Sequence, residues 1–246
     1  MKISFLISGI CVGAVSAATV NINTLADLGE PSETVKAIGQ SPTYQNRTVG
    51  GVEAVTTKDA TFAVSIDFNA GDSANNGVIW ESGGATIGST LSYNQAAATL
   101  SVHHSTNSGN ALGVVTHQLT DAQVSGGEVE VVWAYDASEI DFELFVDGAS
   151  SGTTVDTTEV ARTQNNWSGA NAAGFGIFGG NFAAGNGDNT NLAAIANLGD
   201  TATINLDTGL RFWAGKDAQF AVAVPEPSSI ALLGLASLFA MRRQRR

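Results

Sequence analysis

The chain has 246 residues and a formal net charge of −12, with 23 acidic against 11 basic residues. A surface this acidic repels phosphate backbones, which excludes nucleic acid as an expected partner. Residues 19–224 are enough for one domain with a sizeable core, and we expect a single domain over this range.

The N-terminus has the pattern of an export signal. Lys2 precedes an apolar run over residues 3–15, and small residues follow at the position where signal peptidase cleaves. We therefore expect a signal peptide over residues 1–18 that directs export by Sec. Cleavage is expected after Ala17 or Ala18.

Cysteine chemistry is excluded for the exported chain. The single cysteine, Cys11, lies inside the expected signal peptide. Ile10 before it is not the small residue that a lipoprotein signal requires, so we expect Cys11 to be removed with the signal. Without Cys11, the mature domain has no disulfides, no thiol catalysis and no cysteine metal site, and its stability must come from a packed core.

The domain reads as a series of short strands. Along residues 61–68, Phe62, Val64, Ile66 and Phe68 alternate with smaller or polar residues, as in a half-buried antiparallel strand. Turn-forming clusters separate similar runs, which we expect at residues 77–81, 90–93, 99–103, 112–117, 128–135, 140–146 and 174–178. Many short strands at this spacing predict an all-β antiparallel jelly-roll sandwich.

Four of these runs also resemble a known family. Residues 61–68, 77–84 and 131–136, together with the aromatic-Val-Asp-Gly hairpin of residues 144–148, look like successive strands of a LamG-like, concanavalin A-like jelly roll. Asn166-Trp167-Ser168 and residues 176–180 fit a later strand of that family. The resemblance covers about residues 60–180, and it implies that residues 19–59 and 181–224 supply the remaining strands.

One short motif points to catalysis. Glu139-Ile140-Asp141-Phe142-Glu143 resembles the active-site strand of glycoside hydrolase family 16, a family of laminarinases and lichenases on the same type of fold. The resemblance implies that Glu139 is the nucleophile, Asp141 the assisting acid and Glu143 the acid/base. Strand alternation would place all three carboxylates on one face.

The residues around this motif favour a non-catalytic interpretation. Residues 144–148 form the LamG-type hairpin directly downstream, and residues 136–138 read as a turn, which places Glu139 at the start of a strand. Acids that alternate with apolar residues are also typical of any strand with one solvated face. We therefore expect no enzyme activity, with a retaining β-glucanase as the alternative.

Metal binding is expected only through oxygen ligands. His103 and His104 are adjacent on a predicted strand and point to opposite faces, so with His117 they do not make a ready metal site, and we expect them on the surface, solvated or hydrogen-bonded. Two loops rich in Asp and Asn contain Asp72 and Asp188, and such hard oxygen ligands suit calcium. The LamG resemblance also implies calcium in some members.

Two tryptophans have different expected positions. Trp133 lies in an apolar run, which predicts a core position. Trp167 lies between Asn166 and Ser168, which predicts a loop, where its ring would meet a sugar or a partner protein or would cover the fold. Trp167 is therefore the candidate ligand-binding residue.

The C-terminus has the pattern of a sorting signal. Pro225-Glu226-Pro227 precedes the uncharged residues 228–241. This stretch would form a helix of about 21 Å, which is too short to span a hydrocarbon core of roughly 30 Å comfortably. A basic cluster then ends the chain at Arg242, Arg243, Arg245 and Arg246.

This order of elements resembles the PEP-CTERM sorting signal of Gram-negative bacteria. The resemblance implies that an exosortase reads and cleaves residues 225–246 during export. The terminal arginines would stay on the cytoplasmic side and hold the protein briefly at the inner membrane. The tail thus indicates a destination at the cell surface or in the extracellular polysaccharide matrix.

These patterns predict an exported, non-catalytic protein with an adhesive or structural role. Extracellular polysaccharide is a candidate ligand. Two alternatives stay open: a family 16-like glucanase that uses Glu139, Asp141 and Glu143, and a matrix filler with no specific ligand.

Overall fold

The computed structural model describes most of the central domain and neither of the terminal signals. It describes residues 18–35, 57–68, 77–83, 87–106, 112–156, 166–167, 173–178, 204–206 and 209–221. The expected signal helix, the sorting motif at residues 225–227, the hydrophobic helix with its arginines, and the calcium candidates Asp72 and Asp188 lie outside these residues. No helix in the described stretches is long and apolar enough to cross a membrane.

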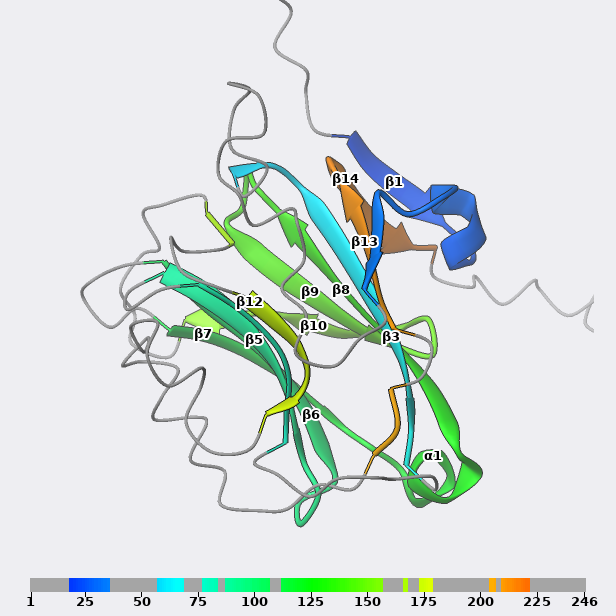
Figure 1. Cartoon of the computed structure of the whole chain (residues 1–246). Coiled ribbons are helices and arrows are strands. Elements are labelled where there is room, and N and C mark those ends of the chain that lie inside the picture. The colour runs from blue at the N-terminus through cyan, green and yellow to red at the C-terminus, as the bar shows by residue number, and fades with distance from the viewer. Residues whose placement is uncertain are drawn as a thin grey trace, which may run out of the picture.

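Two six-stranded sheets pack face to face as a sandwich (Figure 1). The first sheet has the order β10-β9-β8-β3-β13-β2, with β10 Ala149–Thr153, β9 Asp141–Val146, β8 Glu128–Asp136, β3 Ala60–Asp67, β13 Leu210–Ala214 and β2 Glu33–Val35. The second has the order β11-β7-β6-β5-β4-β12, with β11 Val155–Asp156, β7 Leu112–Gln118, β6 Thr99–Thr106, β5 Ile87–Asn94, β4 Val78–Gly83 and β12 Ala173–Phe178. Neighbours within both sheets run antiparallel. The predicted all-β jelly-roll sandwich is confirmed.

Every strand predicted from residue alternation is present, most of them with longer bounds. The segments that flank the LamG-like region also supply strands, as expected, including β2 and β13. Two short helices were not predicted: the 3-10 helix η1 over Leu25–Leu28 and α1 over Asp121–Gly126. One pairing departs from the antiparallel prediction, because β1 (Ala18–Ile22) and β14 (Lys216–Phe220) form a separate parallel pair.

An aromatic core fills the space between the sheets. Phe62 on β3 lies at its centre, stacked on Trp133 with ring centroids 5.4 Å apart and an angle of 11° between the rings. Trp80 and Phe212 also contact Phe62, at 4.8 and 5.0 Å. The alternation of β3 places Phe62 and Val64 in this core, so the predicted inward face and the core position of Trp133 are both confirmed.

The outer face of the first sheet, which points away from the second sheet, carries another apolar cluster. Val132, Phe145 and Trp213 lie there, on the alternate residues of strands whose other residues fill the inner core. The N-terminal segment covers this cluster with Ile22, Leu25 and Leu28, and β14 contributes Ala218. The outer face therefore needs both ends of the domain for its cover.

β1 and β14 together form what we call the strap, residues 18–22 and 216–220. Figure 1 shows the two strands side by side, apart from the two sheets. Thr61 of β3 fastens the strap, since its Oγ1 donates to the Lys216 carbonyl at 2.8 Å and accepts from the Ala218 amide at 3.1 Å. The Ala221 amide donates to the Ile22 carbonyl at 2.8 Å and closes the pair.

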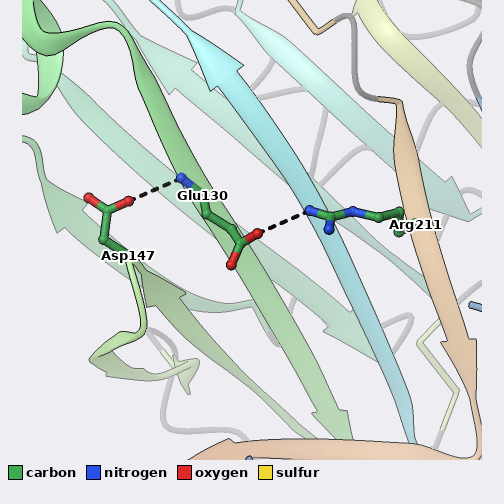
Figure 2. A network of polar contacts seen from close by, with 3 residues as sticks. All are labelled: Glu130, Asp147 and Arg211. Atoms are coloured by element: carbon green, nitrogen blue, oxygen red, sulfur yellow. Dashed lines mark hydrogen bonds and ion pairs between the residues drawn. The ribbon is translucent and has the colours of Figure 1, made fainter. Parts of the chain in front are cut away.

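The predicted Asp147-Gly148 hairpin joins β9 to β10. Both residues have positive φ angles of 52° and 75°, as the favoured two-residue hairpin turns require. Asp147 also accepts from the Glu130 amide at 3.1 Å, while the Glu130 carboxylate pairs with Arg211 at 3.2 Å (Figure 2). This network ties the hairpin to β8 and β13.

Candidate functional site

A hollow opens on the outer face of the first sheet, beside the strap. Its volume is about 310 Å³. The first sheet and the turn before β9 supply most of its wall, and β14 supplies the remainder. The lining residues are Ala134, Asp136, Glu139, Asp141, Glu143, Thr153, Asp217 and Gln219. We call this feature the acidic hollow, because five of these eight residues are acids.

The structure brings the three acids of the predicted motif together in the acidic hollow. On β9, Asp141 and Glu143 point to the outer face, while Phe142 and Leu144 between and after them are fully buried in the inner core. Glu139 reaches the hollow in another way than predicted. It lies in the turn over residues 137–140, since β9 begins only at Asp141.

Hydrogen bonds hold this turn. Asp136 ends β8, and its Oδ1 accepts from the Ser138 amide at 2.7 Å and from the Ser138 hydroxyl at 2.6 Å. The Ile140 amide donates to the Asp136 carbonyl at 2.9 Å, and Ile140 has a positive φ of 61°. A turn is therefore present as predicted, but it spans residues 137–140 instead of 136–138, and Glu139 lies within it and not at the start of a strand.

Two carboxylates of the motif accept hydrogen bonds from hydroxyl groups on the chain that follows β9. Thr154 Oγ1 donates to Asp141 Oδ1 at 3.0 Å, and Thr154 also accepts from the Phe142 amide at 3.1 Å. Ser150 Oγ donates to Glu143 Oε1 at 2.5 Å. These contacts tie β9 to the chain that follows it, so both acids have a structural role.

Sequence reasoning missed the most buried acid of the hollow, Asp217. Only 2% of this residue is exposed, and burial raises the pKa of its carboxyl to about 6. Gln219 donates to both Asp217 oxygens at 3.2 and 3.3 Å, which opposes the rise, while the charges of Asp136, Asp59 and Glu143 add to it. No local pattern around residue 217 signals this environment, because the facing acids come from distant parts of the chain.

Asp59 is a second buried acid that the sequence did not single out. It is 3% exposed and lies directly before β3. Burial raises the pKa of its carboxyl, although the Ala137 amide donates to it at 3.0 Å and works against the rise. Asp136 raises the pKa of Asp59 further. Asp59 and Asp217 therefore belong to one interacting group of carboxylates.

The prediction that the Trp167 ring faces a ligand is wrong. The residue is fully buried, with its ring edge-on to Phe62 at 5.1 Å and tilted against Phe212 at 5.9 Å. Its carbonyl accepts from the Ser89 hydroxyl at 2.6 Å. Polar neighbours in the sequence suggested a surface loop, but burial of a large indole in an aromatic core is the more favourable arrangement.

The histidines occupy separate environments. His103 and His104 point to opposite faces of β6, as predicted, but both are buried rather than on the surface. His104 packs edge-on against Tyr135 and Phe142, and burial lowers the pKa of His103 to about 4. Within the described ranges, no three His, Cys, Asp or Glu side chains come together as metal ligands.

The comparison with known families identifies the tail. Residues 223–246 match the PEP-CTERM protein-sorting motif, which confirms the resemblance seen in Pro225-Glu226-Pro227 and the basic end. The chain is therefore an exported protein that carries a PEP-CTERM sorting signal for exosortase. No curated protein matches the sequence.

Several solved structures of low identity share part of the architecture. The CBM40 of Ruminococcus gnavus IT-sialidase bound to α2,6-sialyllactose has 12% identity and a TM-score of 0.44, with 75% of this chain and 90% of that chain covered. The binding domain of botulinum neurotoxin DC in complex with rat synaptotagmin II has 11% identity and a TM-score of 0.42. That match covers 67% of this chain and 34% of the neurotoxin chain, so this chain spans about a third of it. At such identities and TM-scores, no function follows from these similarities.

Proposed function

We propose that the protein is cleaved by an exosortase at the inner membrane and remains at the cell surface or in the extracellular polysaccharide matrix. The observation that carries this proposal is the sorting motif over residues 223–246. The export pattern of the first 18 residues supports it, since the two signals act at opposite ends of one domain. Signal peptidase removes the first segment, and the exosortase removes the second.

The mass of the protein recovered from its exporting host tests this processing. We expect a chain that begins near Ala18 or Thr19 and ends close to Pro225-Glu226-Pro227. A variant with Glu226→Ala should stay in the inner-membrane fraction, while Glu128→Ala on the exposed end of β8 should be released normally. A surface protein that still contains Arg246 would contradict the proposal.

For the sandwich itself we propose a non-catalytic, adhesive or structural role, with extracellular polysaccharide as the ligand to test first. The chemistry of the acidic hollow supports this role over catalysis. Asp141 and Glu143 accept hydrogen bonds from hydroxyl groups of the chain itself. The described lining of the hollow contains no aromatic ring on which a sugar could stack. A matrix filler without a specific ligand remains the simpler form of the same proposal.

A second candidate function, a retaining β-glucanase, is favoured by one observation. Glu139, Asp141 and Glu143 line the same hollow, and Asp217 with its raised pKa faces them. Carboxyl groups in different environments are what an acid and a nucleophile require, at a separation of about 5 to 5.5 Å in retaining enzymes. The hollow would then be an active site on the outer face.

Incubation of the full-length chain with β-1,3-glucan and mixed-linkage glucan separates the two functions. We expect no release of reducing sugar, and we expect Glu139→Gln and Glu143→Gln to leave cosedimentation with the host polysaccharide unchanged. Release by wild type that is lost in Glu139→Gln but kept in Glu128→Gln would establish the glucanase instead. If the wild type neither cleaves nor cosediments, the filler role is supported.

We further propose that the loops containing Asp72 and Asp188 hold structural calcium. Asp and Asn side chains supply the hard oxygen ligands that calcium prefers. A metal that binds only the folded state raises its stability by mass action. The Tm of the full-length chain should therefore fall with a chelator and recover with millimolar calcium. An unchanged Tm, or equal recovery with magnesium, would contradict a calcium site.

A further inference from the structure

The strap is attached to the sandwich along a face that contains the acidic hollow. Thr61 forms two hydrogen bonds with the backbone of β14. Ile22 and Ala218 of the strap belong to the apolar cluster on the outer face of the first sheet. Asp217 and Gln219, also on β14, form the strap's wall of the hollow. Separation of the strap from the sheet would therefore remove one wall of the hollow and expose the buried Asp217 to water.

Asp217 faces carboxylates from β8, from β9 and from the turn between these strands. Asp136 lies on β8, Asp141 and Glu143 lie on β9, and Glu139 lies in the turn between them. Asp59, before β3, also acts on the charge of Asp217. These groups come from three separate parts of the first sheet and converge on one strand of the strap.

None of the described residues that line the acidic hollow is a lysine or an arginine. Lys216, the neighbour of Asp217, donates its Nζ to the Leu28 carbonyl. Arg211 pairs with Glu130 further along the sheet. Full ionisation of the carboxylates therefore places like charges around Asp217, a residue that is only 2% exposed.

We propose that the strap is a proton-sensitive clasp, which docks more tightly when the buried Asp217 carboxyl holds a proton and loosens when this carboxyl is ionised. Docking buries Asp217 between the strap and the sheet, whereas release returns this carboxylate to water. Protonation of Asp217 removes its negative charge and with it the repulsion from Asp136, Asp59 and Glu143. The pH response of the clasp is therefore opposite to that of a salt bridge, because a salt bridge needs ionised partners.

The sign follows from linkage. The pKa of Asp217 is raised from 3.8 to about 6 in the docked state, so the docked state binds the proton more tightly. Docking is therefore strongest below pH 4, weakens as the pH rises from 4 through 6, and stays at its lower level above that.

Hydrogen–deuterium exchange of the full-length chain in mild detergent tests the clasp at about pH 5 and about pH 7.5, after correction for intrinsic exchange. We expect protection of the β1 and β14 amides to fall by about threefold to tenfold at the higher pH. Protection of the β5–β6 amides should change much less, because those strands have no part in the clasp. The Asp217→Asn variant should show the higher strap protection at both pH values.

Two further variants keep the test decisive. Asp121→Asn removes an exposed acid of α1 and should keep the wild-type response. Asp59→Asn should weaken the pH response of strap protection without abolishing it. This variant replaces Asp217→Asn in the test if Asp217→Asn does not fold, which a loss of β5–β6 protection would show. Equal strap protection at both pH values in the wild type, or an unchanged response in Asp217→Asn, would overturn the proposal.

Discussion

The two faces of the first sheet are built from the same strands and have opposite chemistry. The inner face presents Phe62, Trp133 and Phe142, which contact other aromatic rings and are fully buried. The outer face combines a small apolar cluster with the acidic hollow, and both depend on the strap for their cover. Strand alternation therefore gives one sheet two different faces: the inner residues form the aromatic core, and the outer residues form a smaller apolar cluster beside a group of acids.

The strongest way to break this comparison is to remove an inner ring. Phe62→Ala should cost about 3 to 5 kcal/mol in the free energy of unfolding, because a cavity is left at the centre of the aromatic core. Urea unfolding of the full-length chain measures this loss. Phe220→Ala removes a partly buried ring on the strap and is the matched control. Its loss of unfolding free energy should be clearly smaller. Equal losses would show that the two faces contribute alike.

A smaller effect is expected from the strap. Ile22→Ala should cost about 2 kcal/mol, since Ile22 is 1% exposed under the outer cluster. The loss should appear first as faster amide exchange in β14, before β5 and β6 are affected. Val20→Ala on the same strand is the control, because Val20 is only partly buried. Simultaneous exposure of the whole sandwich would contradict a separate strap.

His103 sharpens the comparison through the opposite pH response. Burial lowers the pKa of His103 to about 4, so the folded state resists its protonation. The contribution is complete above pH 6.5 and is lost as the pH falls toward 4, about 1 kcal/mol between pH 7.5 and 5.5. His103→Gln should flatten this part of the curve of unfolding free energy against pH. Identical curves for His103→Gln and wild type would refute the assignment.

The smallest effect is expected at the Glu130–Arg211 pair. Both side chains are partly exposed, 38% and 26%, so solvent screens the attraction. Arg211→Met should cost between about 0 and 1 kcal/mol, and the difference should shrink in high salt. Thermal unfolding at low and high salt measures it, with Arg211→Lys as the conservative control. A loss of unfolding free energy as large as that of Ile22→Ala would mean that the ion pair stabilises the sheet as much as the outer apolar cluster does.

Local patterns predicted the parts of the fold that local chemistry determines. Alternation along residues 61–68 was enough to place Phe62 in the core, and Asp147-Gly148 was enough to predict the hairpin. The motif at residues 139–143 likewise predicted acids on a common side, apart from the turn that moves Glu139 off the strand.

Contacts between distant segments left no such pattern. The acid environment of Asp217 arises because β14 crosses the outer face of a sheet whose acids lie more than 70 residues earlier in the sequence. Trp167 has polar neighbours, and only the aromatic residues of other strands explain its burial. Both depend on tertiary packing, which overrides local preference.

The parallel pairing of β1 with β14 sets the order of events during secretion. A chain that crosses the membrane from its N-terminus delivers β1 first, and the partner of β1 arrives only after nearly the whole domain has followed. Closure of such a long loop is slow, since its entropy must be lost before the contacts form. The outer layer thus stays incomplete until the last strand emerges, immediately ahead of the sorting tail. Completion of the fold and export of the sorting tail become nearly simultaneous events.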